Sequence, residues 1–168
     1  MQIIQIVGYK SSGKTTLAKT LITSLAKKGI KVASLKHHGH GGIPVGMKET
    51  DSEKHRQAGA IISGVEGQNM LQLSNQYAWE MEQMIAIYKL LKTEVLVMEG
   101  FKQYNYNKIV LIRNEEDLHL LEQMTNIRAV MTRIQLKQTS YPYPIFKQEE
   151  IKDFHKCFFS LFPNQWAD

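Results

Sequence analysis

The chain has 168 residues, 43% of them hydrophobic and 22% charged, which suits one globular domain, and no apolar run approaches the ~18 residues of a membrane span. Lys and Arg outnumber Asp and Glu by 21 to 16; the net charge of +5 favours an anionic ligand, but no basic block interleaved with aromatics indicates nucleic acid. No secretory signal is evident and a single cysteine, Cys157, excludes an internal disulfide, so a cytoplasmic protein is predicted.

Apolar spacing predicts strands and helices that alternate along most of the chain. The first half of the chain is expected to contain a strand at residues 2–7, a helix at 14–28, a strand at 30–36, a glycine-rich loop at 37–50 and a short helix from its cap at Asp51 or Ser52 to about Gly59. Strands at 60–66 and 70–73 and a helix from Met81 to Leu91 follow. The rest is expected to contain strands at 94–98 and 108–112, a short helix at 115–122, a strand at 127–131 and a helix at 151–162. A GQN turn makes the strands at 60–66 and 70–73 a hairpin. The alternation predicts a single α/β domain over residues 1–168, a sandwich around a mainly parallel sheet with the antiparallel hairpin added.

The first predicted strand leads into GYKSSGKT at residues 8–15, which matches the phosphate-binding motif GxxxxGK followed by Ser or Thr. The two glycines let successive N–H groups point at an anion, and the following helix directs its positive dipole end at the same place. Lys14 is predicted to reach the β- and γ-phosphates and Thr15 to hold Mg²⁺. The motif favours a three-layer P-loop NTPase fold. The predicted nucleotide-binding residues of this loop are Gly8, Lys10, Ser11, Ser12, Gly13, Lys14, Thr15 and Thr16. For Lys10, a phosphate contact across a dimer interface and a solvated loop lysine both fit.

The run VLVMEG places Glu99 at the end of a second apolar strand. Nucleotide-hydrolysing proteins commonly position Mg²⁺ with an acidic residue at such a place, so Glu99 is predicted beside Thr15 as a catalytic and metal-binding residue. Gly100 follows it, and a second carboxylate is not evident. The sequence therefore predicts a slow or partner-dependent hydrolase; the alternative for Glu99 is a solvent-exposed carboxylate.

Four histidines fall within the segments KHHGH, from Lys36 to His40, and TDSEKHRQAGA, from Thr50 to Ala60. Their place after a strand is where open α/β sheets bind ligands. Three interpretations fit: a transition-metal cluster, donors to an anionic ligand, or solvated loop residues. Asp51 is predicted either to cap its helix or to complete the Mg²⁺ shell.

Together these segments resemble the molybdopterin-guanine dinucleotide biosynthesis protein B (MobB) family. The resemblance rests on GYKSSGKTT, KHHGH, TDSEKHRQAGA and EGFK, the last followed by Lys108 and Arg113, and spans residues 2 to about 113. It implies a GTP-binding protein, usually a homodimer, with feeble Mg²⁺-dependent GTPase activity. It also implies that the protein assists a MobA-type guanylyltransferase in attaching GMP to molybdopterin, with molybdopterin or its guanine dinucleotide as a further ligand.

The resemblance carries roles over to matching positions. Glu99 is the acidic strand-end residue, and the residues expected to face nucleotide or pterin phosphate are Lys36, His37, His40, Asp51, Arg56, Lys102 and Arg113. Extra residues in VGMKETDS leave Lys48 without a clear counterpart. Guanine specificity rests on the resemblance alone, because Asn107-Lys108 matches the NKxD motif only by chance.

Two other classes share the phosphate loop. A small-molecule kinase normally has an arginine-bearing lid, and the four arginines here do not cluster in the sequence. A metal-delivery GTPase fits the histidine loop, although a longer histidine tract or paired cysteines would be expected. Transfer of label from nucleotide to a small acceptor would favour the kinase, and tight stoichiometric metal binding the metal-delivery GTPase.

Overall fold

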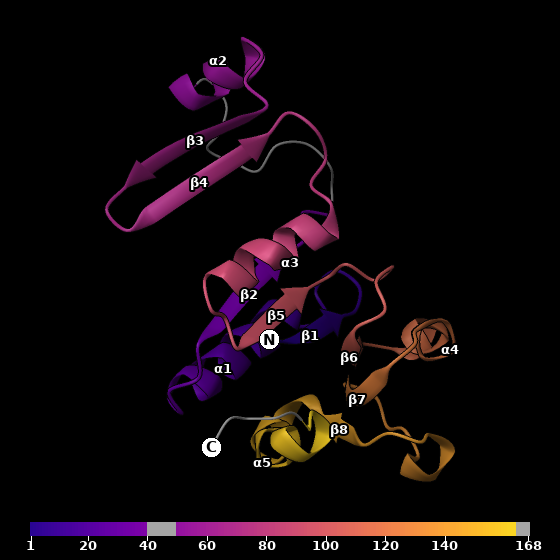
Figure 1. Cartoon of the computed structure of the whole chain (residues 1–168). Helices are drawn as coiled ribbons and strands as arrows, with labels where there is room; N and C mark the ends of the chain where they lie inside the picture. Colours follow the sequence, from indigo (N-terminus) through magenta and orange to yellow (C-terminus); the bar gives the residue numbers. More distant parts are fainter. Residues whose placement is uncertain (40–49, 164–168) are drawn as a thin grey trace. The chain divides into compact units, whose positions relative to one another are not determined.

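The computed structural model describes residues 1–39 and 50–163. The chain divides into two compact units, one made of Met1–His37 and Tyr88–Asp168 and the other of His38–Ile87. Figure 1 labels their elements, and each unit is described by itself.

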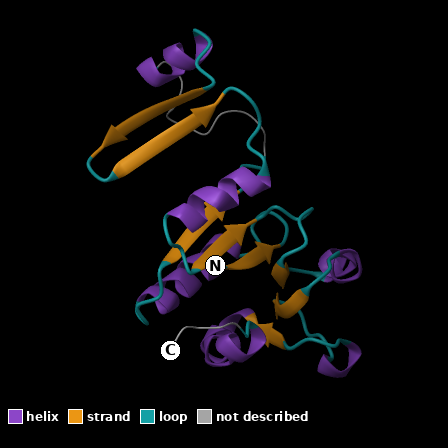
Figure 2. Ribbon diagram, viewed as in Figure 1, coloured by secondary structure: helices purple, strands orange, loops and turns teal. Residues whose placement is uncertain are grey.

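The first unit contains a six-stranded sheet in the order β2-β5-β1-β6-β7-β8, drawn in orange in Figure 2. Its pairings within the described residues are all parallel, which confirms the predicted parallel sheet. The strands are β1 (Gln2–Val7), β2 (Val32–Lys36), β5 (Val95–Glu99), β6 (Asn107–Ile112), β7 (Ile127–Thr132) and β8 (Ile145–Lys147).

Alternating side chains of these strands bury two separate faces, which gives three layers. On β6, Ile109 and Leu111 join a core with α1 (Lys14–Ala26) and α5 (Ile151–Leu161). Val110 and Ile112 point the other way, into a core with the 3₁₀ turn Glu115–Leu118 and α4 (His119–Gln123). The sandwich around the sheet is therefore confirmed. Helix α3 (Met81–Leu90) precedes β5.

The second unit contains α2 (Asp51–Gln57) and the hairpin of β3 (Ile62–Gly67) and β4 (Met70–Asn75). The hairpin is antiparallel as predicted, and its strands pair with each other in a two-stranded sheet of their own. Gln68 and Asn69 in its turn have φ angles of 43° and 67°, the left-handed conformation that tight hairpin turns require.

Two local predictions need correction. The cap of α2 is Thr50, not Asp51 or Ser52: Thr50 has extended backbone, and its hydroxyl accepts a hydrogen bond from the Glu53 N–H at 3.3 Å. Strand β8 was not predicted, because only three residues of SYPYPIFK are regular and two prolines precede them. Within residues 1–39 and 50–163, no helix has both the length and the apolar character needed to cross a bilayer.

Candidate functional site

The candidate site lies at the carboxyl ends of β2, β5 and β1, which neighbour one another in the sheet. Parallel register sets Ile6 of β1 and Lys36 of β2 on either side of Glu99. The phosphate loop starts two residues after Ile6, so it emerges at the same edge as Lys36 and Glu99. This is the edge at which open parallel sheets bind ligands.

The loop from Gly8 to Gly13 is tightly folded. A Cβ on Gly8 would lie 2.6 Å from the Ser12 hydroxyl and 3.0 Å from the Leu111 carbonyl oxygen, so only glycine fits. Gly13, the N-cap of α1, has a φ of 96°, a left-handed conformation that glycine adopts without strain. The Ser12 hydroxyl is buried and has no hydrogen-bond partner within the described residues.

Side chains of α1 and the strand ends meet directly in front of this loop. The Thr15 hydroxyl lies 2.9 and 3.0 Å from the two carboxylate oxygens of Glu99, which confirms the predicted proximity of these two residues. The Lys36 ammonium lies 3.3 Å from a Glu99 oxygen. Lys14 donates to the Tyr9 carbonyl oxygen at 2.6 Å, which folds it back over the loop. Burial lowers the pKa of Lys14 and the nearby cations lower it further, whereas Glu99 opposes that shift.

A second cationic group covers the loop from the β6 side. The Lys102 ammonium lies 3.7 Å from the centroid of the Tyr9 ring, and the Arg113 guanidinium lies 5.4 Å from it. Arg113 also donates to the Lys10 carbonyl oxygen at 2.9 Å and makes two side-chain hydrogen bonds of 2.8 Å to buried Asp117. These hydrogen bonds from Arg113 hold the pKa of Asp117 below its usual range. Arg113 therefore joins the loop to a buried carboxylate.

His119 anchors Tyr9 from the other end of its ring. The His119 Nδ1 lies 2.6 Å from the Glu116 carbonyl oxygen, which only accepts, so Nδ1 carries the proton. The His119 Nε2 and the Tyr9 hydroxyl share a hydrogen bond of 2.7 Å. This hydrogen bond holds Tyr9, and with it the phosphate loop, against α4.

The phosphate loop is also contacted by a residue near the C-terminal end of the chain. Gln148 donates to the Ser12 carbonyl oxygen at 2.8 Å and accepts at 2.8 Å from Arg133, which follows β7. This glutamine was missed in the sequence, where nothing connects it to a loop 136 residues earlier. Arg113 and Arg133 are thus both brought to the phosphate loop, although the arginines are dispersed in the sequence.

The loop that carries Lys102 is supported from inside the sheet. Gln5, fully buried on β1, donates to the Phe101 carbonyl oxygen at 2.8 Å and accepts from the Tyr106 N–H at 3.1 Å. Lys108, 1% exposed on β6, donates to the carbonyl oxygens of Tyr104 and Tyr106 at 2.7 and 3.0 Å. Burial lowers its pKa. Lys108 is therefore a strand residue that supports a loop. This agrees with the interpretation that Asn107-Lys108 matches the NKxD motif only by chance.

The remaining predicted residues divide by location. Lys10, Ser11 and Thr16 are exposed on the loop or the first turn of α1. The His37 ring packs 5.0 Å from that of Phe101, next to the site. Two others belong to the second unit, where Asp51 pairs with Lys54 at 2.9 Å and Arg56 pairs with Glu53. Their predicted roles stay predictions. His40 and Lys48 lie outside the described residues.

The described part of the chain gives no support to the interpretation of the histidine loop as a transition-metal site. In residues 1–39 and 50–163, no three His, Cys, Asp or Glu side chains are gathered closely enough to hold a metal ion. The site instead offers one hydroxyl and one carboxylate, Thr15 and Glu99, among several cations. This arrangement suits a polyphosphate with a hard, oxygen-seeking cation better than a transition metal.

Comparison with known proteins identifies the family of the chain. The family model "MobB: Molybdopterin guanine dinucleotide synthesis protein B" matches residues 3–133. The chain belongs to the MobB family. A Bacillus subtilis (strain 168) protein described as "Probable molybdopterin-guanine dinucleotide biosynthesis adapter protein" is 37% identical over 150 residues, 88% of this chain and 86% of that protein.

Solved MobB structures share the fold. The crystal structure of Bacillus subtilis MobB aligns with a TM-score of 0.77 and 31% identity, covering 98% of this chain and 99% of that one. A MobB homologue from Bacillus stearothermophilus aligns with a TM-score of 0.76 and 30% identity, covering 95% and 97%. The MobB match includes the phosphate loop, Glu99, Lys102 and Arg113 but ends at Arg133, so Gln148 lies beyond it.

Proposed function

We propose that this MobB-family chain binds GTP with Mg²⁺ at the phosphate loop and serves as an adapter in molybdopterin-guanine dinucleotide biosynthesis. The observation that carries the proposal is the meeting of Thr15 and Glu99, at 2.9 and 3.0 Å, in front of a loop that begins at Gly8 and ends at Lys14. A hydroxyl and a carboxylate are oxygen ligands of the kind Mg²⁺ takes beside a nucleotide.

Several groups are suited to the phosphates. Loop N–H groups and the N-terminus of α1 attract anions, and Lys14, Lys36, Lys102 and Arg113 supply positive charge. Lys14 is held by the Tyr9 carbonyl oxygen and is partly desolvated, so a phosphate oxygen is a better partner for its charge than that carbonyl. Mg²⁺, when bound, would neutralise phosphate charge from the side of Thr15 and Glu99.

Hydrolysis is expected to be slow. Glu99 interacts with both the Thr15 hydroxyl and the Lys36 ammonium, which leaves it poorly placed to orient an attacking water as well. Asp117, a buried carboxylate near the loop, is paired with Arg113. A weak GTPase fits an adapter whose nucleotide state regulates a partner.

The adapter role follows from the relatives. Proteins from Bacillus subtilis, Haemophilus influenzae and Escherichia coli that resemble this chain are described as molybdopterin-guanine dinucleotide biosynthesis adapter proteins, the first of them as probable. The partner we propose is a MobA-type guanylyltransferase, with molybdopterin or its guanine dinucleotide passing between the two proteins. The net charge of +5 favours such phosphate-bearing ligands.

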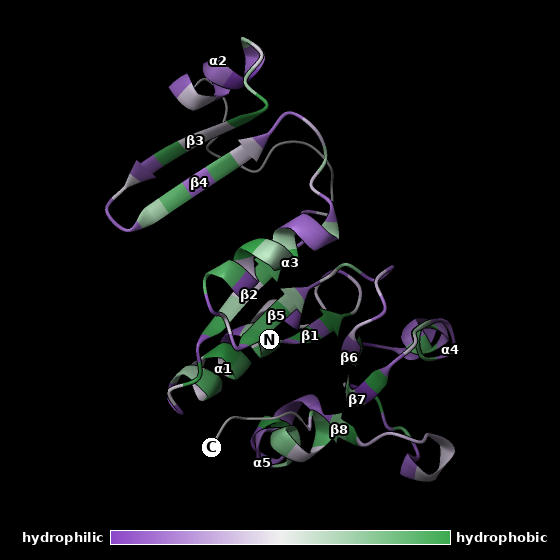
Figure 3. Ribbon diagram, in the orientation of Figure 1, coloured by the Kyte–Doolittle hydropathy of each residue, from purple (hydrophilic) through white to green (hydrophobic). Residues whose placement is uncertain are grey.

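A homodimer is the proposed assembly. The hairpin of the second unit has apolar residues along both strands, drawn as the green segments of β3 and β4 in Figure 3, and large ones among them are exposed. The exposed fractions are 53% for Ile62, 49% for Val65, 63% for Met70 and 65% for Leu71. A monomer seldom leaves so apolar a strand pair open to solvent, and a second copy of the hairpin matches it in chemistry.

Binding of fluorescent GTP and ATP analogues with Mg²⁺, measured on the wild type and Lys14→Ala, tests the proposal. We expect the wild type to bind GTP in preference to ATP and Lys14→Ala to lose this binding. Turnover assays with and without a MobA-type partner would then follow. Lys28→Ala, at the other end of α1, is a matched control that should bind like wild type. Preference for ATP, with transfer of label to a small acceptor, would overturn the proposal in favour of a kinase.

A further inference from the structure

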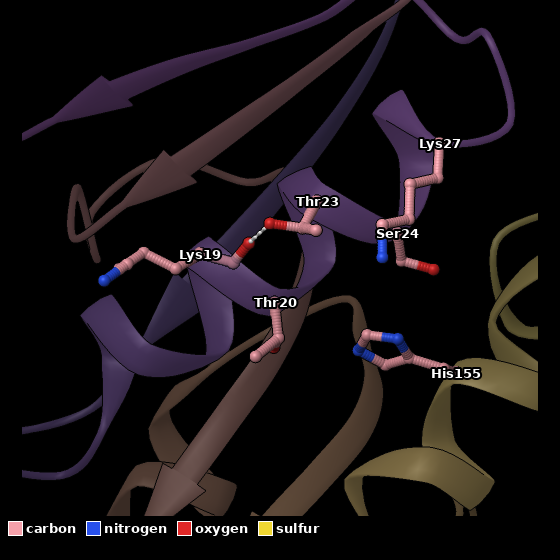
Figure 4. Close-up of a pocket in the computed structure, with 6 residues that line it drawn as sticks. All are labelled: Lys19, Thr20, Thr23, Ser24, Lys27 and His155. Carbon is pink, nitrogen blue, oxygen red and sulfur yellow. Dashed lines mark hydrogen bonds between the residues drawn. The ribbon is translucent and has the colours of Figure 1, made fainter.

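A pocket of about 410 Å³ lies between α1 and α5, in the first unit. Figure 4 shows the side chains that line it, with the His155 ring of α5 directed toward α1. Four lining residues come from α1, one is its C-cap and one comes from α5: Lys19, Thr20, Thr23, Ser24, Lys27 and His155. The volume is within the range of small-molecule sites and exceeds that of a bare phosphate ion.

This pocket is separate from the phosphate loop. Leu17, Leu21 and Leu25 bury one face of α1 in the core, and the lining residues lie outside that stripe, on the part of the helix nearer α5. At 1.5 Å per residue, Thr23 lies roughly 13 Å along the helix from Lys14. A ligand in the pocket and one at the loop would therefore use different atoms.

The pocket carries positive charge that the protein does not neutralise. Neither Lys19 nor Lys27 has a carboxylate within ion-pair distance among residues 1–39 and 50–163. The acidic residue nearest to His155 in α5, Asp153, is paired with Lys156 at 2.7 Å. An anion is thus the ligand that the charge distribution favours.

Neutral donors accompany this charge. His155 Nε2 is buried and has no hydrogen-bond partner within the described residues. Burial lowers the pKa of His155, so the ring is neutral at pH 7, and a neutral ring donates from one nitrogen. The Ser24 hydroxyl adjoins it, whereas the Thr20 and Thr23 hydroxyls donate to carbonyl oxygens of their own helix. In the tautomer that carries the proton on Nε2, the ring has a buried donor without an acceptor, which is costly and which an oxyanion would satisfy.

We propose that this pocket binds the phosphate group of a phosphorylated small molecule, with Lys27, Ser24 and His155 as its contacts. Ammonium, hydroxyl and imidazole N–H groups are all donors, which suits the acceptor-only oxygens of a phosphate monoester. The space beyond one phosphate ion accommodates the attached organic group. This proposal does not depend on the nucleotide bound at the phosphate loop.

The test uses the full chain carrying Lys14→Ala, which disables the phosphate loop, with inorganic phosphate and glycerol 3-phosphate as probes. Calorimetry gives the affinity, and the NMR signal of the His155 imidazole gives the location. We expect saturable shifts of that signal and tighter binding of glycerol 3-phosphate. Lys27→Met should weaken binding about tenfold, the equivalent of one charge-assisted hydrogen bond.

Lys28→Met is the matched control: Lys28 is the next residue in the chain after Lys27, but it lies over the Phe159 ring, 5.2 Å away, outside the pocket lining. It should bind like the parent. His155→Gln, which keeps a donor, should retain more affinity than His155→Phe, and circular dichroism establishes that each variant is folded. No shift of the His155 signal at millimolar probe, or equal losses in Lys27→Met and Lys28→Met, would overturn the proposal.

Discussion

Substitution of Asp117 by Asn tests whether a buried carboxylate holds the phosphate loop in place through Arg113. Asp117 is 1% exposed and accepts two 2.8 Å hydrogen bonds from the Arg113 side chain and one of 2.9 Å from its backbone N–H. Asparagine keeps one acceptor oxygen and loses the charge. Hydrogen bonds to charged groups contribute about 1.5–3 kcal/mol to stability. The Arg113 side chain is 29% exposed, so in the variant water replaces part of what its guanidinium loses. Asp117→Asn should therefore destabilise the fold by about 2 kcal/mol.

Urea unfolding and thermal melting measure this loss. A change of that size corresponds to a Tm decrease of roughly 4–8 °C in a chain of this length. Asp153→Asn is the matched control: Asp153 also pairs with a cation at close range, but its side chain is 61% exposed and that of its partner 76%. Water screens such a pair, so its removal should leave the melting temperature unchanged.

The pH dependence gives an independent check. Hydrogen bonding to Arg113 lowers the pKa of Asp117, so the stability that this residue contributes is fully present above the unfolded-state value of about 3.9. It is lost as the pH falls from there through the folded-state pKa. The stability difference between wild type and Asp117→Asn should therefore shrink below pH ~4. Equal Tm decreases for Asp117→Asn and Asp153→Asn, or a difference constant down to pH 2, would refute the reasoning.

Three further substitutions address the loop directly. Gly8→Ala should abolish GTP binding measured by calorimetry, because its Cβ would lie 2.6 Å from the Ser12 hydroxyl and 3.0 Å from the Leu111 carbonyl oxygen; unchanged binding would show that the loop is adaptable. Gln148→Ala removes the hydrogen bond to the Ser12 carbonyl and should weaken GTP binding about fivefold, roughly 1 kcal/mol; no change would leave that contact without a role in binding. Lys36→Met removes a cation 3.3 Å from Glu99 and should lower the Mg²⁺ concentration required for GTP binding; a higher requirement would show that the charge Lys36 supplies to the phosphates outweighs its competition with Mg²⁺ at Glu99.

Much of the sheet could be predicted because its strands are buried on both faces. VLVME and KIVLI are almost wholly apolar, as fully covered parallel strands are, and a glycine-rich motif marks the turn after β1. Parallel register then places the ends of β1, β2 and β5 together. The pairing of Thr15 with Glu99 across 84 positions followed from that topology rather than from sequence proximity.

The supports of the site were beyond prediction. Gln5, Lys108 and Gln148 are polar residues whose importance depends on which carbonyl oxygens lie near them after folding. A polar residue in an apolar strand is as consistent with a solvent-exposed position at the edge of the sheet as with a buried side chain that hydrogen-bonds to a neighbouring loop. Only the three-dimensional neighbours decide between them, since no local periodicity encodes a contact between β6 and the loop that precedes it.

The site in this structure is held by internal hydrogen bonds that a ligand has to replace. Lys14 is bound to the Tyr9 carbonyl oxygen, and the Thr15 hydroxyl is bound to Glu99. Polyphosphate with Mg²⁺ offers stronger partners for both, a charged oxygen for Lys14 and a divalent cation for Thr15 and Glu99. Burial lowers the pKa of Lys14, and nearby cations lower it further against the opposing effect of Glu99, so an anion at the loop would favour the charged form of Lys14. Ligand binding should therefore stabilise the strand ends as well as the loop, which is how an adapter without rapid turnover would report its nucleotide state to a partner.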